Sequence, residues 1–282
     1  MKPSSQLVAL MTDFGLQDPY VGMMKGVIAG LSPFSSIVDL THGIQAQNVL
    51  QGALYLGLSA PYFPDGTVFV AVVDPGVGTN RKAVALVTEK QFFVAPDNGL
   101  LSYVMKTQKS EACYSITNPS FMLPVQSATF HGRDIFAPAA AHLANGTDPA
   151  NLGDAIEPEQ CVEVVLPENS STDGGFSWKG EVLFTDVYGN LVTSFTDGLL
   201  NKDGEPAVGI RMENGTVLPF HRTYGDVEEG KALSYRGSSG FLEIGIRNGN
   251  ASRSLGLYPG DSIVLLLKPE TSQERHTQEH RR

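Results

Sequence analysis

The sequence predicts an α/β protein, with an N-terminal, mainly parallel sheet flanked by helices and a smaller C-terminal all-β domain. In the N-terminal half, short apolar strand-like runs alternate with helix-like segments. At residues 167–175 the composition changes to Glu, Asn, Ser, Thr, Asp and Gly without periodicity, which is typical of a linker or long loop. Beyond this segment the apolar runs are strand-like and are separated by Gly, Asn and Asp turns.

The N-terminal elements follow one another in regular alternation. A buried strand at residues 6–11 precedes a helix at residues 20–31. The remaining predicted strands are 36–39, 67–73, 83–88 and 91–95, and the remaining predicted helices are 46–60, 99–106 and 134–144. Polar residues recur at the strand ends, which is where open α/β sheets bind ligands.

The C-terminal elements predict a small β barrel or sandwich. The predicted strands are 179–184, 191–195, 207–211, 232–235, 241–246 and 262–267. We therefore place one domain at residues 1–166 and a second at 176–270. Residues 271–282 are charged and lack apolar anchors, so we expect a disordered tail there.

Composition excludes several classes of protein. The formal net charge of −10 argues against nucleic acid as a partner, because binding phosphates requires clustered Lys and Arg, and favours a cationic or zwitterionic small ligand. No apolar run approaches the roughly 20 residues that span a bilayer. Residues 7–11 lack a secretory cleavage pattern, so we expect a cytoplasmic location. Cys113 and Cys161 lie in no CxxC or Cys/His cluster, so neither a zinc site nor a disulfide framework is indicated, and inert thiols are expected.

Asp13 follows the first predicted strand directly. A carboxylate at this position could accept hydrogen bonds from both hydroxyls of a ribose. It could equally cap the helix that starts near Pro19. The local sequence leaves both interpretations open.

Residues 73–81 place Asp74 and Arg81 around glycines that allow close backbone approach. The chain continues into another strand-like run and lacks a Gly-Lys-Ser/Thr ending, which disfavours dinucleotide and triphosphate sites. The segment predicts either an active-site loop or a Gly-rich turn with a surface Asp–Arg pair.

Further candidates lie at other predicted turns and helix starts. His131 lies beside a glycine, directly before the predicted helix at 134–144. Asp186 and Asn190 lie in a turn of the second domain, where an Asn amide can donate to and accept from an adenine edge, although hairpin turns use the same residues. The segments 238–243 and 248–251 place small polar residues and a carboxylate near the predicted rim of the second domain.

Taken in order, six segments resemble the S-adenosylmethionine (SAM) hydrolases, also called SAM hydroxide adenosyltransferases, which are related to fluorinase and chlorinase. The segments are residues 12–15 (Thr-Asp-Phe-Gly), 74–78 (Asp-Pro-Gly-Val-Gly) with Arg81, 96–100 (Pro-Asp-Asn-Gly-Leu), 130–134 (Phe-His-Gly-Arg-Asp), 186–190 (Asp-Val-Tyr-Gly-Asn) and 239–243 (Ser-Gly-Phe-Leu-Glu). The resemblance covers roughly residues 6–268. It implies an α/β N-terminal domain, a C-terminal β barrel and a homotrimer with its sites at the subunit interfaces.

The resemblance also implies an activity, the hydrolysis of SAM at C5′ by an activated water to give adenosine and L-methionine. No metal or other cofactor is implied, because the sulfonium leaves as neutral methionine. The implied catalytic residues are Asp74, Arg81 and His131, which would hold one water in line with the C5′–S bond, with Asp74 or His131 accepting its hydrogen bonds. The implied substrate-binding residues are Asp13 for the ribose diol, Asn190, Tyr224 and the backbone near Ala251 for the adenine, and Asp186, Ser239 and Glu243 for the amino-acid end and neighbouring groups.

Two other functions remain open from the sequence. The halogenases have a tyrosine in place of Asp74 and lack His131, and a buried carboxylate would repel an incoming halide, which disfavours a SAM-dependent halide transferase. Gly132 replaces a serine of the halogenases, and Gln47 replaces a stacking tryptophan. A sensor module that binds adenosine or SAM without turnover is the non-enzymatic alternative.

Overall fold

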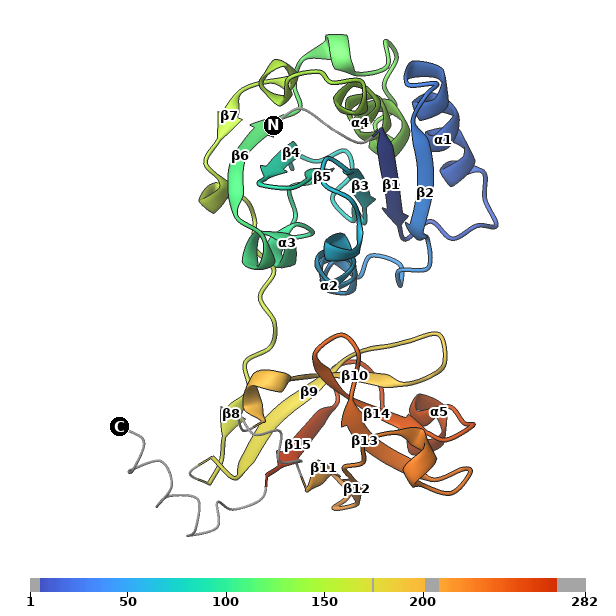
Figure 1. The fold of residues 1–282 in the computed structure, drawn as a ribbon, viewed down its shortest axis with the longest axis vertical. Helices are drawn as coiled ribbons and strands as arrows, with labels where there is room; N and C mark the ends of the chain where they lie inside the picture. Colours follow the sequence, from blue (N-terminus) through green and yellow to red (C-terminus); the bar gives the residue numbers. More distant parts are fainter. Residues whose placement is uncertain (1–5, 174, 201–207, 268–282) are drawn as a thin grey trace. The chain divides into compact units, whose positions relative to one another are not determined.

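The structure is a computed structural model in which the chain divides into two compact units (Figure 1). The described residues are 6–173, 175–200 and 208–267. The first unit ends at Val165 and the second begins at Leu166. The tail expected at residues 271–282 lies outside the described residues. No helix in the described ranges has both the length and the apolar character needed to cross a bilayer.

The first unit is a sheet with helices packed on both faces. Its strands are β1 (Leu7–Thr12), β2 (Ser36–Thr41), β3 (Val68–Val72), β4 (Ala83–Thr88), β5 (Phe92–Pro96), β6 (Ser110–Ser115) and β7 (Ala155–Ile156), and its helices are α1 (Tyr20–Leu31), α2 (Val49–Ser59), α3 (Ser102–Thr107) and α4 (Ala137–Ala144). Among the described residues the strand order is β2-β1-β3-β5-β4-β6-β7. The pairings among β2, β1, β3 and β5 are parallel, and those of β4, β6 and β7 are antiparallel. The predicted α/β class is confirmed, and the sheet is mixed.

Alternation along the central strands divides the apolar side chains between two cores. Val8 and Leu10 of β1 belong to the core that α1 and α4 cover, whereas Ala9 and Met11 belong to the core of α2 and α3. Because both faces are buried, β1 and β3 are nearly continuous apolar runs rather than alternating ones. This is why their strand character is readable from the sequence.

The carboxyl ends of three neighbouring parallel strands lie at one edge of this sheet. Thr12 at the end of β1 pairs with Val72 at the end of β3, and Met11 pairs with Thr41 at the end of β2. The loops after these strands carry Asp13, Asp74 and His42. Ligand sites of open α/β sheets occur at such an edge.

The second unit is a nearly closed antiparallel barrel (Figure 1). Its strands are β8 (Ser170–Ser171), β9 (Ser177–Thr185), β10 (Leu191–Thr196), β11 (Gly209–Met212), β12 (Val217–Pro219), β13 (Ala232–Arg236), β14 (Phe241–Ile246) and β15 (Ser262–Leu266), with the short helix α5 (Ala251–Leu255). In the described residues the order is β12-β11-β15-β9-β10-β14-β13, and β8 pairs with β9. A bridge between Phe220 and Ser234 joins the two ends of this order. The predicted C-terminal barrel is therefore confirmed.

Three predicted helices have different bounds in the structure. The helix expected at 99–106 is α3, at Ser102–Thr107. The helix expected at 46–60 begins at Val49, because the side chain of Asn48 accepts a hydrogen bond from Gln51 N and caps it. The helix expected at 134–144 is preceded by a π-helical turn at Gly132–Phe136, which brings helical backbone directly next to His131.

Candidate active site

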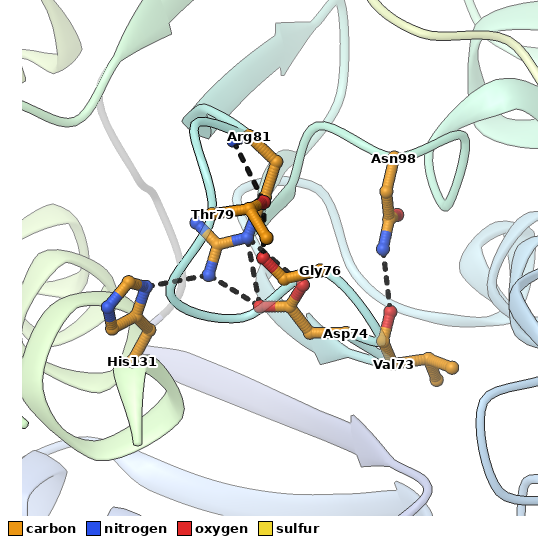
Figure 2. Close-up of polar contacts among 7 residues, drawn as sticks. All are labelled: Val73, Asp74, Gly76, Thr79, Arg81, Asn98 and His131. Atoms are coloured by element: carbon orange, nitrogen blue, oxygen red, sulfur yellow. Dashed lines mark hydrogen bonds and ion pairs between the residues drawn. The ribbon is translucent and has the colours of Figure 1, made fainter. Parts of the chain in front are cut away.

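A charged cluster lies at the carboxyl edge of the first unit's sheet (Figure 2). Arg81 Nε donates to Asp74 Oδ1 at 3.0 Å and to Oδ2 at 2.9 Å, and Arg81 Nη2 also donates to Oδ2. The same Nη2 lies 2.7 Å from His131 Nδ1. The side chains of Arg81 and Asp74 are only 9% and 6% exposed, so the interpretation as a surface Asp–Arg pair is wrong. The guanidinium of Arg81 contacts both Asp74 and His131, so the three predicted catalytic residues form one cluster.

The loop at residues 73–81 is held in shape by contacts with two other loops. Asn98 Nδ2 donates to the carbonyl of Val73 at 2.8 Å, directly before Asp74 (Figure 2). Gly78 has a φ of +78°, and a Cβ there would lie 2.7 Å from the carbonyl oxygen of Ala128. The glycine is therefore required both for its conformation and for the close approach of the segment that leads to His131.

The contacts of Arg81 fix which nitrogen of His131 accepts. A guanidinium has only donors, so His131 Nδ1 accepts from Arg81 and the neutral ring carries its proton on Nε2. Burial lowers the pKa of His131, and the positive charge of Arg81 lowers it further, against the opposing effect of Asp74. His131 is thus a neutral N–H donor at Nε2, and the carboxylate of Asp74 is the acceptor of the cluster.

Asp13 is held by a backbone group rather than used as a helix cap. Its Oδ2 accepts from Gln47 N at 2.8 Å. The interpretation of Asp13 as the cap of α1 is wrong, because Pro19 occupies that position. The ring of the next residue, Phe14, packs edge-on against Phe130 with centroids 6.0 Å apart, which brings the Asp13 loop to the loop of His131.

A second polar cluster lies in the barrel, at the turn between β9 and β10. Asp186 Oδ1 accepts from Tyr188 N at 2.9 Å and from Asn190 N at 2.8 Å, and its Oδ2 accepts from Asn190 Nδ2 at 2.8 Å. Tyr224 Oη lies 2.9 Å from Asn190 Oδ1. The segment is therefore a hairpin turn, which is one of the two interpretations of its sequence. The structure also brings Asn190 and Tyr224 together, as the adenine-binding role implied by the resemblance requires. One N–H and one lone pair of the Asn190 amide remain for a ligand.

Tyr235 completes this cluster and was not predicted from the sequence. Its Oη lies 2.6 Å from the Tyr224 hydroxyl and donates to Glu243 Oε2 at 2.6 Å. Ser239, in the turn between β13 and β14, lies near this carboxylate and lowers the pKa of Glu243. Tyr235 and Glu243 are cross-strand partners in the hairpin of β13 and β14. A register counted outward from Ser239, at the centre of the hairpin turn, would have paired these two residues.

The segment at Ala251 lies against the same turn. Ala251 is buried and begins α5, which Asn250 caps through its side chain. Ser252 N donates to the carbonyl of Gly189 at 3.1 Å. The backbone near Ala251 therefore lies next to the turn that carries Asn190. The ligand contacts assigned to all of these residues stay predictions.

Neither unit shows a metal centre within the residues that the structure describes, where no group of three His, Cys, Asp or Glu side chains could hold an ion. The expectation that no cofactor is needed stays a prediction. The thiols of Cys113 and Cys161 are free and buried, and their sulfurs lie 3.7 Å apart, although 48 residues separate them in sequence.

Two family models match the chain. The model of the SAM hydroxide adenosyltransferase N-terminal domain covers residues 8–153, and that of the C-terminal domain covers residues 180–264. The chain belongs to the SAM hydroxide adenosyltransferase family. The resemblance stated from the six segments is thereby confirmed.

Relatives of this family member include hydrolases and, at lower identity, fluorinases. An (R)-S-adenosyl-L-methionine hydrolase of Thermus thermophilus is 39% identical over 266 residues, which are 92% of this chain and 99% of that protein. A fluorinase of an Actinoplanes species is 27% identical over 271 residues, covering 84% of this chain and 90% of that protein. A solved structure from Thermotoga maritima has a TM-score of 0.83 at 34% identity, covering 92% of this chain and 99% of that one.

Proposed function

We propose that this chain hydrolyses SAM at the C5′–S bond to give adenosine and L-methionine. The observation that carries the proposal is the guanidinium of Arg81, which joins a buried carboxylate and a neutral imidazole at the carboxyl edge of the sheet, where open α/β sheets bind ligands. Such a cluster offers an acceptor and a donor to one water molecule. Family membership and the names of the hydrolase relatives support the same activity.

In the proposed reaction a water oxygen attacks C5′ in line with the sulfur. The C–S bond breaks, its electron pair stays on the sulfur, and methionine leaves as a neutral thioether. Asp74 accepts the proton that the attacking water loses, and Nε2–H of His131 orients the water. Arg81 fixes the orientation of the Asp74 carboxylate, because it donates to both of its oxygens.

Substrate recognition follows the predicted assignments. The diol of the ribose would bind Oδ1 of Asp13, because Oδ2 already accepts from Gln47 N. Asn190, Tyr224 and the backbone near Ala251 would bind the adenine, and Asp186, Ser239 and Glu243 the amino-acid end. The hydrolase relatives carry the (R) sulfonium epimer in their names, and we propose that this chain accepts that epimer.

We further propose that the enzyme needs no metal or other cofactor, lies in the cytoplasm, and acts as a homotrimer with its sites at subunit interfaces. Activity that survives a chelator would support the first point, and mass photometry would test the trimer. A stable monomer with full activity would contradict the assembly.

Hydrolysis is tested by incubating the chelator-treated protein with each epimer of SAM in ¹⁸O-water and measuring the mass of the nucleoside product by mass spectrometry. Adenosine that carries one ¹⁸O at C5′ is expected, from the (R) epimer at least. Intact SAM together with thermal protection of the protein would instead indicate a binding module. A 5′-chloro nucleoside formed in the presence of chloride would indicate halide transfer.

A further inference from the structure

A buried histidine near Asp13 connects the neighbouring strands β1 and β2 through its side chain. His42, which follows β2, is 5% exposed. Its Nδ1 lies 2.8 Å from Oγ1 of Thr12, the last residue of β1, and its Nε2 lies 3.0 Å from Oδ1 of Asp39. Both ring nitrogens are therefore engaged, and neither contacts the cluster of Asp74, Arg81 and His131.

The chemistry of the partners gives these hydrogen bonds a direction. Burial raises the pKa of Asp39, but hydrogen bonds from Lys25 at 2.6 Å and from His42 outweigh it and hold that pKa below its ordinary value. An ionised carboxylate only accepts, so Nε2 of His42 carries a proton, and in the neutral ring Nδ1 accepts from the Thr12 hydroxyl. The oxygen of Thr12 in turn accepts from Phe14 N at 3.2 Å.

These contacts hold the chain on both sides of Asp13. Phe14 N is bound through Thr12, and Gly15 N donates to the main-chain carbonyl of His42 at 2.8 Å. The carboxylate itself is held at Oδ2 by Gln47 N, and Gln47 has a φ of +66°, which is uncommon for a residue other than glycine. Both the backbone of Asp13 and one of its oxygens are therefore fixed before a ligand binds.

We propose that Thr12 and His42 are positioning residues that set the carboxylate of Asp13 for recognition of a ribose diol. This inference rests on the proposed function, in which Asp13 binds the ribose. Neither residue touches the substrate in this scheme. Loss of either should therefore reduce the discrimination between ribose and deoxyribose ligands, and not only the stability of the fold.

The test compares Thr12→Val, which removes the hydroxyl at nearly constant volume, with Thr12→Ser, which keeps it. The readouts are kcat/KM for SAM relative to its 2′-deoxyribose analogue, and the Kd of adenosine relative to those of 2′- and 3′-deoxyadenosine. Thr12→Val should narrow each ratio by about 3- to 10-fold, in keeping with a weakened hydrogen bond to a charged group. Thr12→Ser should restore the ratios to within about twofold.

Thr193 supplies a matched control in the barrel. Like Thr12 it is a buried strand residue, its hydroxyl donates to Leu242 O at 2.7 Å, and it accepts from Phe195 N, two residues further on, at 3.3 Å. Thr193→Val should therefore lower Tm in the same manner as Thr12→Val and leave the ligand ratios unchanged.

Two substitutions of His42 separate its two ring nitrogens. In His42→Asn the side-chain oxygen can take the place of Nδ1 and still accept from Thr12, whereas in His42→Gln the amide reaches only toward the place of Nε2. We expect His42→Asn to keep more of the ribose preference than His42→Gln.

The outcomes distinguish this inference from the proposed function. A wild-type protein that prefers ribose ligands, with Thr12→Val and His42→Gln keeping that preference at reduced Tm, would overturn the positioning role alone. A wild-type protein that neither hydrolyses SAM nor binds adenosine would overturn the proposed function, and this inference with it. A wild-type protein that acts on SAM and its deoxyribose analogue equally well would overturn the role of Asp13 and the inference, but not hydrolysis.

Discussion

The carboxylate of Asp74 in the first unit lies against a guanidinium, whereas that of Glu243 in the barrel accepts from the hydroxyl of Tyr235 and lies near Asp186. Burial raises the pKa of Glu243, and the charge of Asp186 adds to this rise, although the hydrogen bond from Tyr235 opposes it. No ion pair found among the described residues involves Glu243 or Asp186. The first cluster is thus charge-balanced without substrate, which suits chemistry, and the second would be balanced by a cationic ligand, which suits binding.

The sharpest test of this contrast is Asp74→Asn, which keeps the shape of the side chain and removes its charge. We expect kcat for SAM hydrolysis to fall by about 10²- to 10⁴-fold, the usual contribution of a positioned acid–base group, with KM changed by less than about threefold. Adenosine release followed by chromatography measures both. An equal loss of binding would make Asp74 a ligand contact instead.

The corresponding substitution of a carboxylate by an amide in the barrel, Glu243→Gln, should change KM rather than kcat. Loss of a charged partner for the amino-acid end should raise KM about 10-fold or more while kcat stays within about threefold. Adenosine, which lacks that end, should bind the variant as it binds the wild type, and calorimetry provides this control. A fall in kcat with unchanged KM would break the division of roles between the two clusters.

Local pattern was enough to predict the central elements of the fold. The predicted helix 20–31 and the predicted strands 83–88 and 241–246 coincide with α1, β4 and β14. The missed strand β6 reads Ser-Glu-Ala-Cys-Tyr-Ser, and its pairing with β4 rather than its own apolar content makes it a strand. The missed strand β7 likewise depends on a partner distant in sequence, because it pairs with β6. The missed strands β8 and β12 pair with the adjacent strands β9 and β11, but they are only two and three residues long and carry too few residues to show a pattern.

The candidate site was predictable where residue types form a motif and unpredictable where contacts alone define the role. Asp74, Arg81 and His131 belong to quoted segments, and the structure brings them together. Tyr235 is one of nine tyrosines and carries no local signal, because only its register opposite Glu243 marks it. The 2.8 Å contact between His42 and Thr12 depends in the same way on the parallel pairing of β1 with β2.

The pH dependence tests the first cluster by itself. Because burial and Arg81 hold the pKa of His131 below its ordinary value near 6.5, the ring should stay neutral as the pH falls from 8 through 6.5. We therefore expect kcat/KM to be flat over this range and to fall only at lower pH, when Nδ1 is protonated and repels Arg81. The profile should be recorded in the Glu243→Gln background, which removes the titration of Glu243. A midpoint at or above pH 6.5 would contradict a desolvated His131.

The smallest expected effect is on thermal stability. Replacing the carboxylate by an amide should stabilise the protein at Glu243 and destabilise it at Asp74. Since the pKa of Glu243 is raised in the folded state, its ionised form is destabilising above that pKa, and the effect vanishes below about pH 4.5, where folded and unfolded states are both protonated. Glu243→Gln should therefore raise Tm by about 1–3 °C at pH 7–8 and lose this gain in acid. Asp74→Asn should instead lower the free energy of unfolding by about 1–3 kcal/mol, because buried Arg81 loses its charged partner.

Scanning calorimetry at pH 8 and at pH 4 measures the change in Tm of both variants. Tyr235→Phe is the control, because it removes the hydrogen bond to Glu243 but keeps the charge of that carboxylate. Tyr235→Phe should destabilise the barrel at pH 8, because the carboxylate loses a donor and keeps its cost of burial. If Glu243→Gln and Asp74→Asn lowered Tm alike, the carboxylate of Glu243 would already be balanced within the protein. A cationic end of the substrate would then have no uncompensated charge to bind, and the assignment of the amino-acid end to the barrel would fail.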